Sequence, residues 1–410
     1  MEKRTHSPFP SADRPVMAAI GVVLVIGTAL FVWSDRAKDW RYYQFEFKNM
    51  VAEQLGADRA ADVPSGLQQI WVAELERADR CVTCHQAASW KGFEKAEHPW
   101  RTHPPEPLKA HPIEKFGCTS CHGGQGWAIE TEAAHGQVAH WEEPLLSRSL
   151  GESYTLAGDK NSLMQMNCNS CHRYDRATAG ATALNLAKTL VNEKGCRACH
   201  VINGFGGTIG PDLTEVGDKA PEQYDFSRLS GQRTAFAWHV AHFKDPRALA
   251  EGTVMPNFNF TTEQAQALSM LVLSWKRHDV PARYLAGAPR SDPRSAEEIA
   301  AEQAMRTGPG GWFVQTGCFV CHSVSAFGVK SPAQIGPDLS TAVEDTQSRF
   351  GMTVDAFLKN PTGTMSVVLS RQIILTPEQK EIAIQKLREA YAEHQRQRAA
   401  AGGAAPAPSH

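Results

Sequence analysis

The distribution of apolar and polar positions divides the chain into segments of different character. Residues 15–33, PVMAAIGVVLVIGTALFVW, are a run of 19 uncharged residues, close to the roughly 20 that a membrane core requires. Residues 34–80 have the amphipathic pattern of a helical connector. Residues 81–180 are rich in proline and glycine and show little periodicity, so they contain too few apolar positions for an ordinary core. The pattern predicts a mainly α-helical chain with an N-terminal transmembrane helix and a long irregular segment.

Residues 181–285 and 286–398 repeat one plan. Each begins with a helical run, continues through a stretch that contains the sequence IGPDL, and ends with a second helix. A Ser or Thr with Glu or Gln three residues later predicts where helices begin. These pairs are Thr261 with Gln264, Ser295 with Glu298, and Thr376 with Gln379. The tail, 399–410, is of low complexity and is expected to be disordered.

All ten cysteines fall in five Cys-x-x-Cys-His motifs. Chance would give roughly 0.01 such pentapeptides in a chain of this composition. A disulfide framework would not place histidine after every second cysteine, and a zinc site or a thioredoxin-like pair would explain one motif rather than five. The motif is the attachment signature of haem c, in which two thiols bond the vinyl groups and the histidine becomes the proximal iron ligand. The sequence therefore predicts five haem c groups and their iron.

The attachment residues are Cys81, Cys84, Cys118, Cys121, Cys168, Cys171, Cys196, Cys199, Cys318 and Cys321, and the proximal ligands are His85, His122, His172, His200 and His322. Because haem c is attached on the outer side of the membrane, the chain must cross it. Lys3, Arg4 and Arg14 precede the apolar run and favour a cytoplasmic N-terminus, residues 1–14. A cleaved signal peptide is the competing interpretation, but charged residues follow the run directly, without a small-x-small cleavage site. We expect a single-pass anchor in a bacterial inner (cytoplasmic) membrane and haem domains in the periplasm. The formal net charge of −2 gives no indication of nucleic-acid binding.

The sixth ligand of each iron separates an electron carrier, which has histidine or methionine there, from a catalyst with an open position. Met255 and Met365 each follow a Gly-Thr pair and precede the last helix of their segment. Met352 is a rival to Met365, whereas Met270 and Met305 lie in predicted helices and are expected to fill the core.

Five histidines outside the motifs crowd into 43 residues, and we interpret them as a pool of distal ligands for the first three haems. His103, His111 and His135 are the first choices, and His98 and His140 are the reserves. His239 and His242 are expected to be satisfied surface or interface histidines.

The order helix, Cys-x-x-Cys-His, GPDL, methionine, helix resembles the class I cytochrome c fold in both 181–285 and 286–398. The resemblance implies that Met255 and Met365 are distal ligands. It also implies that the carbonyls of Pro211 and Pro337 accept a hydrogen bond from the proximal imidazoles.

The stretches HPPEPLKAHPIEKFGCTSCHGGQG, 103–126, and PEQYDFSRL, 221–229, are similar to multihaem cytochrome c subunits of bacterial quinol-oxidising complexes. That resemblance implies a membrane partner of the cytochrome b and Rieske type or the alternative complex III type. It also implies a soluble cytochrome c or a terminal oxidase as acceptor. The tandem of a tri-haem segment with two class I modules departs from any single such subunit.

The sequence thus predicts an electron-transfer subunit of an oxidoreductase complex, with no catalytic residue of its own. Electrons would pass from bis-His haems to His/Met haems, because methionine raises the reduction potential. One alternative is a multihaem reductase with an open haem, for which His172 is the weakest case. Another is a NapC/NrfH-like quinol dehydrogenase, which is disfavoured because the first motif begins 48 residues after Trp33. A peroxidase-like dihaem enzyme is the third.

Overall fold

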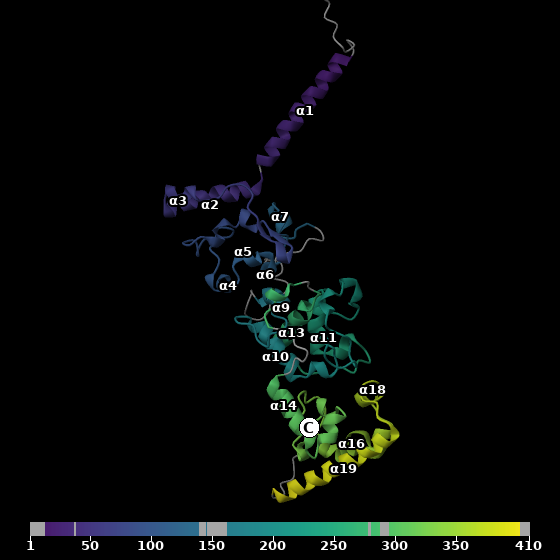
Figure 1. Cartoon of the computed structure of the whole chain (residues 1–410). Coiled ribbons are helices and arrows are strands. Elements are labelled where there is room, and N and C mark those ends of the chain that lie inside the picture. The colour runs from purple at the N-terminus through teal and green to yellow at the C-terminus, as the bar shows by residue number, and fades with distance from the viewer. Residues whose placement is uncertain are drawn as a thin grey trace, which may run out of the picture. The chain divides into compact units, whose positions relative to one another are not determined.

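The computed structural model describes residues 13–36, 38–138, 145, 162–277, 280–287 and 295–401 (Figure 1). This part of the chain is mainly helical, as predicted. The chain divides into two compact units, Met1–Leu150 and Gly151–His410. The division falls inside the segment 81–180, so the motif at 168–172 belongs to the second unit rather than to the unit of the first two motifs. The expectation of disorder from residue 399 is wrong at its start, because helix α19, Pro377–Ala400, includes residues 399 and 400. Residues 402–410 and His140 lie outside the described residues.

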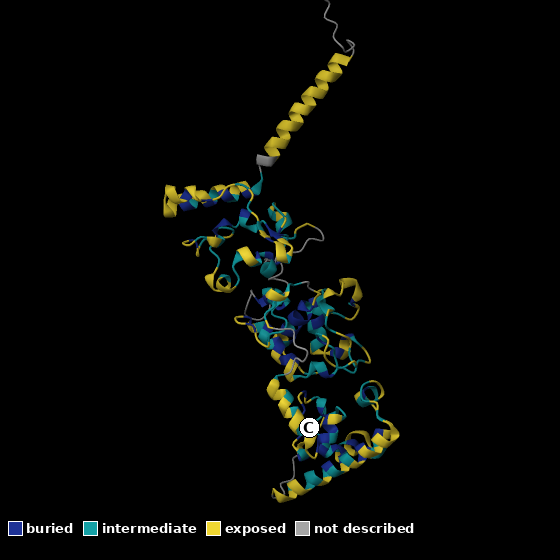
Figure 2. Ribbon diagram, in the orientation of Figure 1, coloured by how far each residue is buried: buried dark blue, intermediate teal, exposed yellow. Residues whose placement is uncertain are grey.

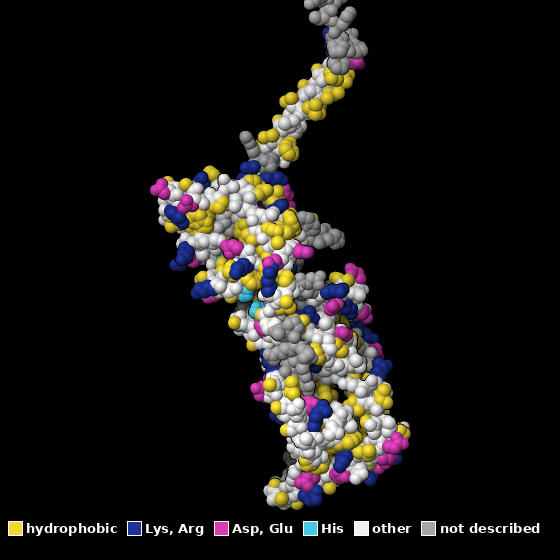
Figure 3. Space-filling model, viewed as in Figure 1, with side chains coloured by type: hydrophobic (Ala, Val, Ile, Leu, Met, Phe, Trp, Pro, Cys, Tyr) yellow, Lys and Arg dark blue, Asp and Glu magenta, His cyan; other side chains and the backbone are white. Residues whose placement is uncertain are grey.

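The apolar run lies within helix α1, Asp13–Arg36. Its described side chains are exposed along the whole helix, as Figures 2 and 3 show. In the described part of the chain it is the one helix long and apolar enough to cross a membrane. A membrane anchor and a signal sequence both have this form.

The connector is helical only in its first half. Helix α2, Asp39–Leu55, ends at Gly56, whose φ of 97° departs from the helix, and the short α3, Ala57–Ala61, follows. The expectation of helix as far as residue 80 is wrong, because strands β1, Ile70–Val72, and β2, Arg77–Asp79, form an antiparallel hairpin. Pro64 and Gly66 stand between the two parts, and both residue types interrupt helices.

The rest of the first unit consists of short turns around a small aromatic core. Phe47 and Val51 of α2 pack with Ala87 and Phe93. The elements are η1 (Ala73–Leu75), η2 (Cys81–Thr83), η3 (Gln86–Ser89), α4 (Pro105–Ala110), α5 (Ile113–Phe116), α6 (Thr119–His122) and α7 (Thr131–Ala134). The core thus joins α2 to the residues directly after the first motif.

The second unit begins with a helical module built around α13, Thr262–Ser274, which is buried along most of its length. Helices α9, α10 and α11 pack against it. The predicted cap of Thr261 with Gln264 is confirmed. The other elements are η4 (Ser162–Met164), α9 (Gln165–Cys171), α10 (Thr182–Glu193), η5 (Cys196–Ala198), η6 (Val216–Asp218), η7 (Pro221–Gln223), α11 (Ala235–Lys244), α12 (Pro246–Leu249) and η8 (Ala282–Tyr284).

The C-terminal part of this unit has its own core, in which Phe313 and Val324 pack with Ile384 and Leu387 of α19, Pro377–Ala400. The predicted caps at Ser295 and Thr376 are confirmed. The remaining elements are α14 (Ala296–Thr307), α15 (Gly311–Gln315), η9 (Cys318–Val320), η10 (Ser325–Phe327), η11 (Leu339–Thr341), α16 (Ala342–Phe350), α17 (Val354–Lys359) and α18 (Thr364–Arg371).

Candidate haem-binding sites

All five Cys-x-x-Cys-His motifs fold into the same turn. In each, the histidine amide donates a hydrogen bond to the carbonyl of the first cysteine, over distances of 2.9 to 3.1 Å. A turn closed by this bond brings residues four apart to one side. Each motif therefore presents its first cysteine and its histidine together, as covalent attachment and iron ligation of one haem require.

Asp79 couples the first motif to the second. This fully buried residue ends β2, two positions before Cys81, and its carboxylate accepts hydrogen bonds from the amides of Cys118 (2.7 Å) and Thr119 (3.3 Å). A Cβ atom on Gly117 would lie 2.0 Å from the same carboxylate, so no other residue fits there. Hydrogen bonding to the Cys118 thiol lowers the pKa of Cys81. Sequence reasoning missed Asp79, because a lone aspartate before a motif carries no signal of its partners.

Helix α2 holds two further parts of the first site. The Gln44 side chain donates to the carbonyl of Thr83, inside the first motif, at 3.0 Å. Asp39 accepts from the Thr131 amide at 2.8 Å, at the start of α7, and α7 leads directly into His135. The 47 residues between Trp33 and the first motif therefore fold back, and their number is no measure of how far this site lies from α1.

Two pairs of imidazoles face each other in the first unit. The ring centroids of His85 and His135 lie 6.3 Å apart, and those of His103 and His122 lie 6.0 Å apart. An iron bonded to two imidazole nitrogens at about 2 Å each would hold the ring centroids roughly 6 Å apart. In each pair, a predicted distal histidine thus lies at the distance from the proximal histidine that binding to one iron would require.

Burial keeps the proximal imidazoles of these pairs neutral, which is the form that binds metal. It lowers the pKa of His85 to about 4, with further lowering from the charges of His135 and His98. It also lowers the pKa of His122, where His103 adds to the effect.

Two other histidines of the pool, His98 and His111, have different surroundings. His111 lies against Phe116, with ring centroids 5.0 Å apart, and its Nδ1 is 3.2 Å from the Pro107 carbonyl oxygen. His98 is exposed. That His111 is a distal ligand stays a prediction.

The third motif belongs to the helical module of the second unit. Asn169, between its two cysteines, donates to Ser274 of α13 at 2.8 Å. His172 Nδ1 lies 2.7 Å from the carboxylate of Asp175, three residues later. A carboxylate that accepts the second ring proton fixes the tautomer of a ligating histidine and raises its basicity. The spacing His-x-x-Asp could have been found in the sequence, but it was not.

The last two motifs share another arrangement. His200 Nδ1 bonds to the carbonyl of Pro211 and His322 Nδ1 bonds to that of Pro337, both at 2.8 Å, which confirms the prediction for both prolines. Burial lowers the pKa of both imidazoles, while the proline carbonyls act in the opposite direction.

The glycines before these prolines give the rings their space. A Cβ on Gly210 would lie 2.4 Å from His200 Cε1, and one on Gly336 would lie 2.2 Å from His322 Cε1.

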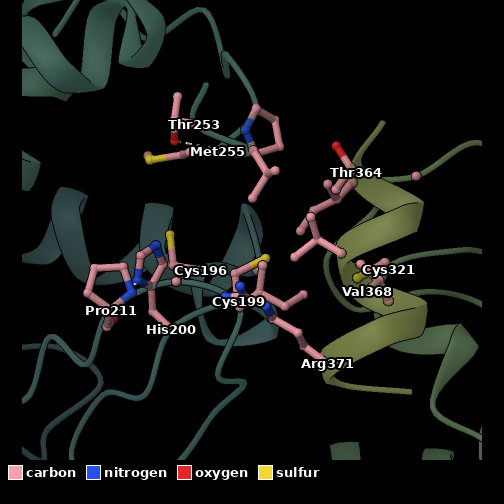
Figure 4. Close-up of a pocket in the computed structure, with 18 of the residues that line it drawn as sticks. Cys196, Cys199, His200, Pro211, Thr253, Met255, Cys321, Thr364, Val368 and Arg371 are labelled. Carbon is pink, nitrogen blue, oxygen red and sulfur yellow. Dashed lines mark hydrogen bonds between the residues drawn. The ribbon is translucent and has the colours of Figure 1, made fainter. Parts of the chain in front are cut away.

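A cavity of about 1390 Å³ opens in front of both histidines. Met255 and Met365 line it, and the rival Met352 is not among the residues that do. In Figure 4, Met255 lies across the cavity from His200, and Thr253 accepts a hydrogen bond from its amide at 3.2 Å. Met270 is buried within α13, as expected of a core residue.

The expectation of satisfied surface or interface histidines holds for His239 only in that it has a hydrogen-bond partner, because His239 is buried rather than at the surface, and His242 is half-buried. His239 is buried and lies 3.0 Å from the Tyr224 hydroxyl, and both histidines line the cavity. The ring of His242 stacks on Trp238, and burial lowers the pKa of His242 to about 4. Its Nδ1 has no hydrogen-bond partner within the described residues, and neither has the hydroxyl of Thr214. Orphaned polar atoms in an apolar cavity of this size suit a large, mainly apolar group with a few polar substituents.

The second unit therefore contains the site of a haem-binding electron-transfer domain, with an attachment motif, an oriented proximal histidine and a methionine across a cavity. The family model described as Cytochrome c matches residues 184–276, and the chain thus contains a cytochrome c domain there. Such a domain implies haem c with its iron. No curated protein and no solved structure matches the chain.

Proposed function

We propose that the chain is a pentahaem electron-transfer cytochrome. It takes electrons from a quinol-oxidising membrane partner and passes them through bis-His haems to His/Met haems, and from there to a periplasmic acceptor or oxidase. The observation that carries the proposal is the facing pair of imidazoles at each of the first two motifs, 6.3 and 6.0 Å apart. Irons with both axial positions taken exchange electrons and do not bind substrate.

In this proposal His135 is the distal ligand at the first motif and His103 is the distal ligand at the second. The shared fold of all five motifs supports attachment at each of them. Haem c supplies a one-electron couple at each site. The surrounding residues orient the imidazoles, keep them neutral and exclude water.

The residues around each proximal histidine support a direction of flow. Methionine ligation raises the reduction potential, so the sites of Met255 and Met365 are expected at the high end. The Asp175 carboxylate makes His172 a more basic ligand than a proline carbonyl would, which lowers the potential at the third motif. A difference of 100 mV corresponds to about 2.3 kcal/mol for one electron. Electrons would therefore run from the first three motifs towards the last two.

A position at the membrane is part of the proposal. Helix α1 would be a retained anchor with its N-terminus in the cytoplasm, and the haem-bearing units would lie in the periplasm. The support is the length and apolar surface of α1 and the absence of a cleavage signal after it. The quinol-oxidising partner and the acceptor are proposed from the resemblance of 103–126 and 221–229 to such subunits.

Electron paramagnetic resonance and optical spectroscopy of the oxidised, full-length protein test this function. Five low-spin irons, two of them with the methionine–iron charge-transfer band, are expected. A high-spin iron that binds cyanide would refute a pure relay and would point to an open site, with His172 as the first place to look. Mass spectrometry of the intact chain counts the attached haems independently.

A further inference from the structure

The cavity of the second unit is shared by two attachment motifs. Cys196, Cys199 and His200 line it from one side, and Cys318, Cys321 and His322 line it from the other. Its volume of about 1390 Å³ exceeds the 300–1,000 Å³ typical of a site for one small molecule. Figure 4 shows Cys199 facing Cys321 and α18 across it. One continuous space thus serves both motifs.

The backbones of the two modules touch where the fourth motif begins. Gly195 directly precedes Cys196, and a Cβ on it would lie 1.9 Å from the Cβ of Ala333 and 2.6 Å from its Cα. Gly195 has a φ of 60°, a conformation that glycine adopts without strain. The two modules are therefore in direct backbone contact beside the fourth motif.

A hydrogen bond joins the C-terminal module to the fourth motif itself. The Gln372 side chain donates to the carbonyl of Ala198, between Cys196 and Cys199, at 3.1 Å. Gln372 directly follows α18, the helix that carries Met365. A Cβ on Gly207 would lie 2.8 Å from the side-chain amide nitrogen of Gln372. A glycine at this position therefore leaves room for the Gln372 side chain.

We infer that the last two haem sites form one dihaem centre, with their thioether-bearing edges turned towards each other and Gln372 as a positioning residue. The positions of the cysteines determine where the vinyl edge of each haem must lie, because the vinyl carbons form the thioether bonds to the cysteine sulfurs. The inference rests on the proposed function, since it requires a haem at each motif. One electron passes from the reduced His200 site to the oxidised His322 site, so one iron is oxidised as the other is reduced and no bond changes. The C-terminal module then acts as half of a coupled pair rather than as a separate carrier.

The test uses the full-length protein with its haems, poised so that only the two high-potential haems are reduced. Circular dichroism in the Soret band reports the coupling of neighbouring macrocycles, and the methionine–iron band of the oxidised protein reports the integrity of each site. The wild type is expected to show a two-signed Soret signal.

Gly195→Ala places a methyl group against Ala333, and this change is expected to abolish the signal while both methionine bands remain. A Soret signal unchanged in Gly195→Ala would overturn the inference. If that variant does not fold, Gln372→Ala decides, because it removes a hydrogen bond and introduces no clash.

In Gln372→Ala, the Soret signal is expected to weaken. The two sites are also expected to titrate independently, each with a midpoint potential that no longer depends on the oxidation state of the other. Gln385→Ala, an exposed glutamine of α19, is the matched control and should leave both unchanged. Equal behaviour of the two glutamine variants would overturn the role of Gln372. Absence of methionine bands from the wild type would instead refute the proposed ligands, so the two failures are distinguishable.

Discussion

The glycines of the two IGPDL stretches allow a sharp test of how the proximal histidines are held. In Gly210→Ala the new Cβ would lie 2.4 Å from His200 Cε1, about 1 Å inside the ordinary contact distance of 3.4 Å. In Gly336→Ala the contact with His322 Cε1 would be 2.2 Å, closer still. The imidazole must move by about 1 Å, half the length of a metal–imidazole bond of about 2 Å. It cannot do so and keep both its bond to iron and its bond to the proline carbonyl.

We expect each alanine to perturb the axial ligation of its own haem and to cost about 1–3 kcal/mol in unfolding free energy, the range for overpacking a filled site. The assay is the methionine–iron band and the low-spin resonance signal of the oxidised protein, followed by a denaturant titration. Gly308→Ala is the matched control, because its Cβ would meet only the Met305 carbonyl oxygen, at 3.7 Å. Unchanged spectra in both Gly210→Ala and Gly336→Ala would refute the tight packing of the imidazoles. A change in one alone would show that the two modules differ.

Three further predictions concern other parts of the molecule. If His135 is the distal ligand at the first motif, as proposed, His135→Met should raise the reduction potential of that site by on the order of 100 mV, measured by potentiometric titration. Asp79→Asn should destabilise the first unit by about 2–4 kcal/mol in a urea titration, because a buried acceptor of two motif amides loses its charge. Asp62→Asn, in an exposed ion pair, should cost under about 1 kcal/mol. Burial lowers the pKa of His239 to about 3. Between pH 6.5 and pH 3, the imidazole of His239 therefore binds a proton in the unfolded chain but not in the folded protein. Stability should fall as the pH drops, by about 2 kcal/mol from this group at pH 5, and His239→Gln should remove that part of the slope.

Each of these has an outcome that contradicts it. An unchanged potential in His135→Met would mean that another residue is the distal ligand. Equal losses of stability in Asp79→Asn and Asp62→Asn would show that the carboxylate of Asp79 does not hold the second motif. Parallel pH profiles for the wild type and His239→Gln would show that His239 is not kept neutral by burial.

The sequence predicted those parts of the molecule that depend on residues close together in the chain. The capping boxes at Thr261, Ser295 and Thr376 were found because a cap is made by side chains three positions apart. The bonds from His200 to Pro211 and from His322 to Pro337 were implied by the resemblance of both modules to class I cytochrome c.

Contacts between residues far apart in the chain could not be predicted from such local patterns. Gln372 and Ala198 are 174 residues apart, and Asp79 and Cys118 are 39 apart. The prediction of a helix over 34–80 was wrong for residues 70–79, which form a hairpin. Its strands are too short to show the alternation of apolar and polar residues that would predict a strand. His239 was expected at the surface or an interface, because nothing in the neighbouring sequence shows that Tyr224 and the cavity bury it.

The hydrogen bonds that join α2 to the first site have a consequence for how this site would meet a partner in the membrane. Only residues 37 and 38 separate α1 from α2, and two residues of extended chain span about 7 Å. Asp39 and Gln44, which bind α7 and the first motif, lie in the first two turns of α2. Where α1 stays in the bilayer, this short tether leaves the first haem little freedom to leave the lipid surface. A membrane-embedded donor would then meet it by lateral diffusion in two dimensions rather than by a search through the periplasm.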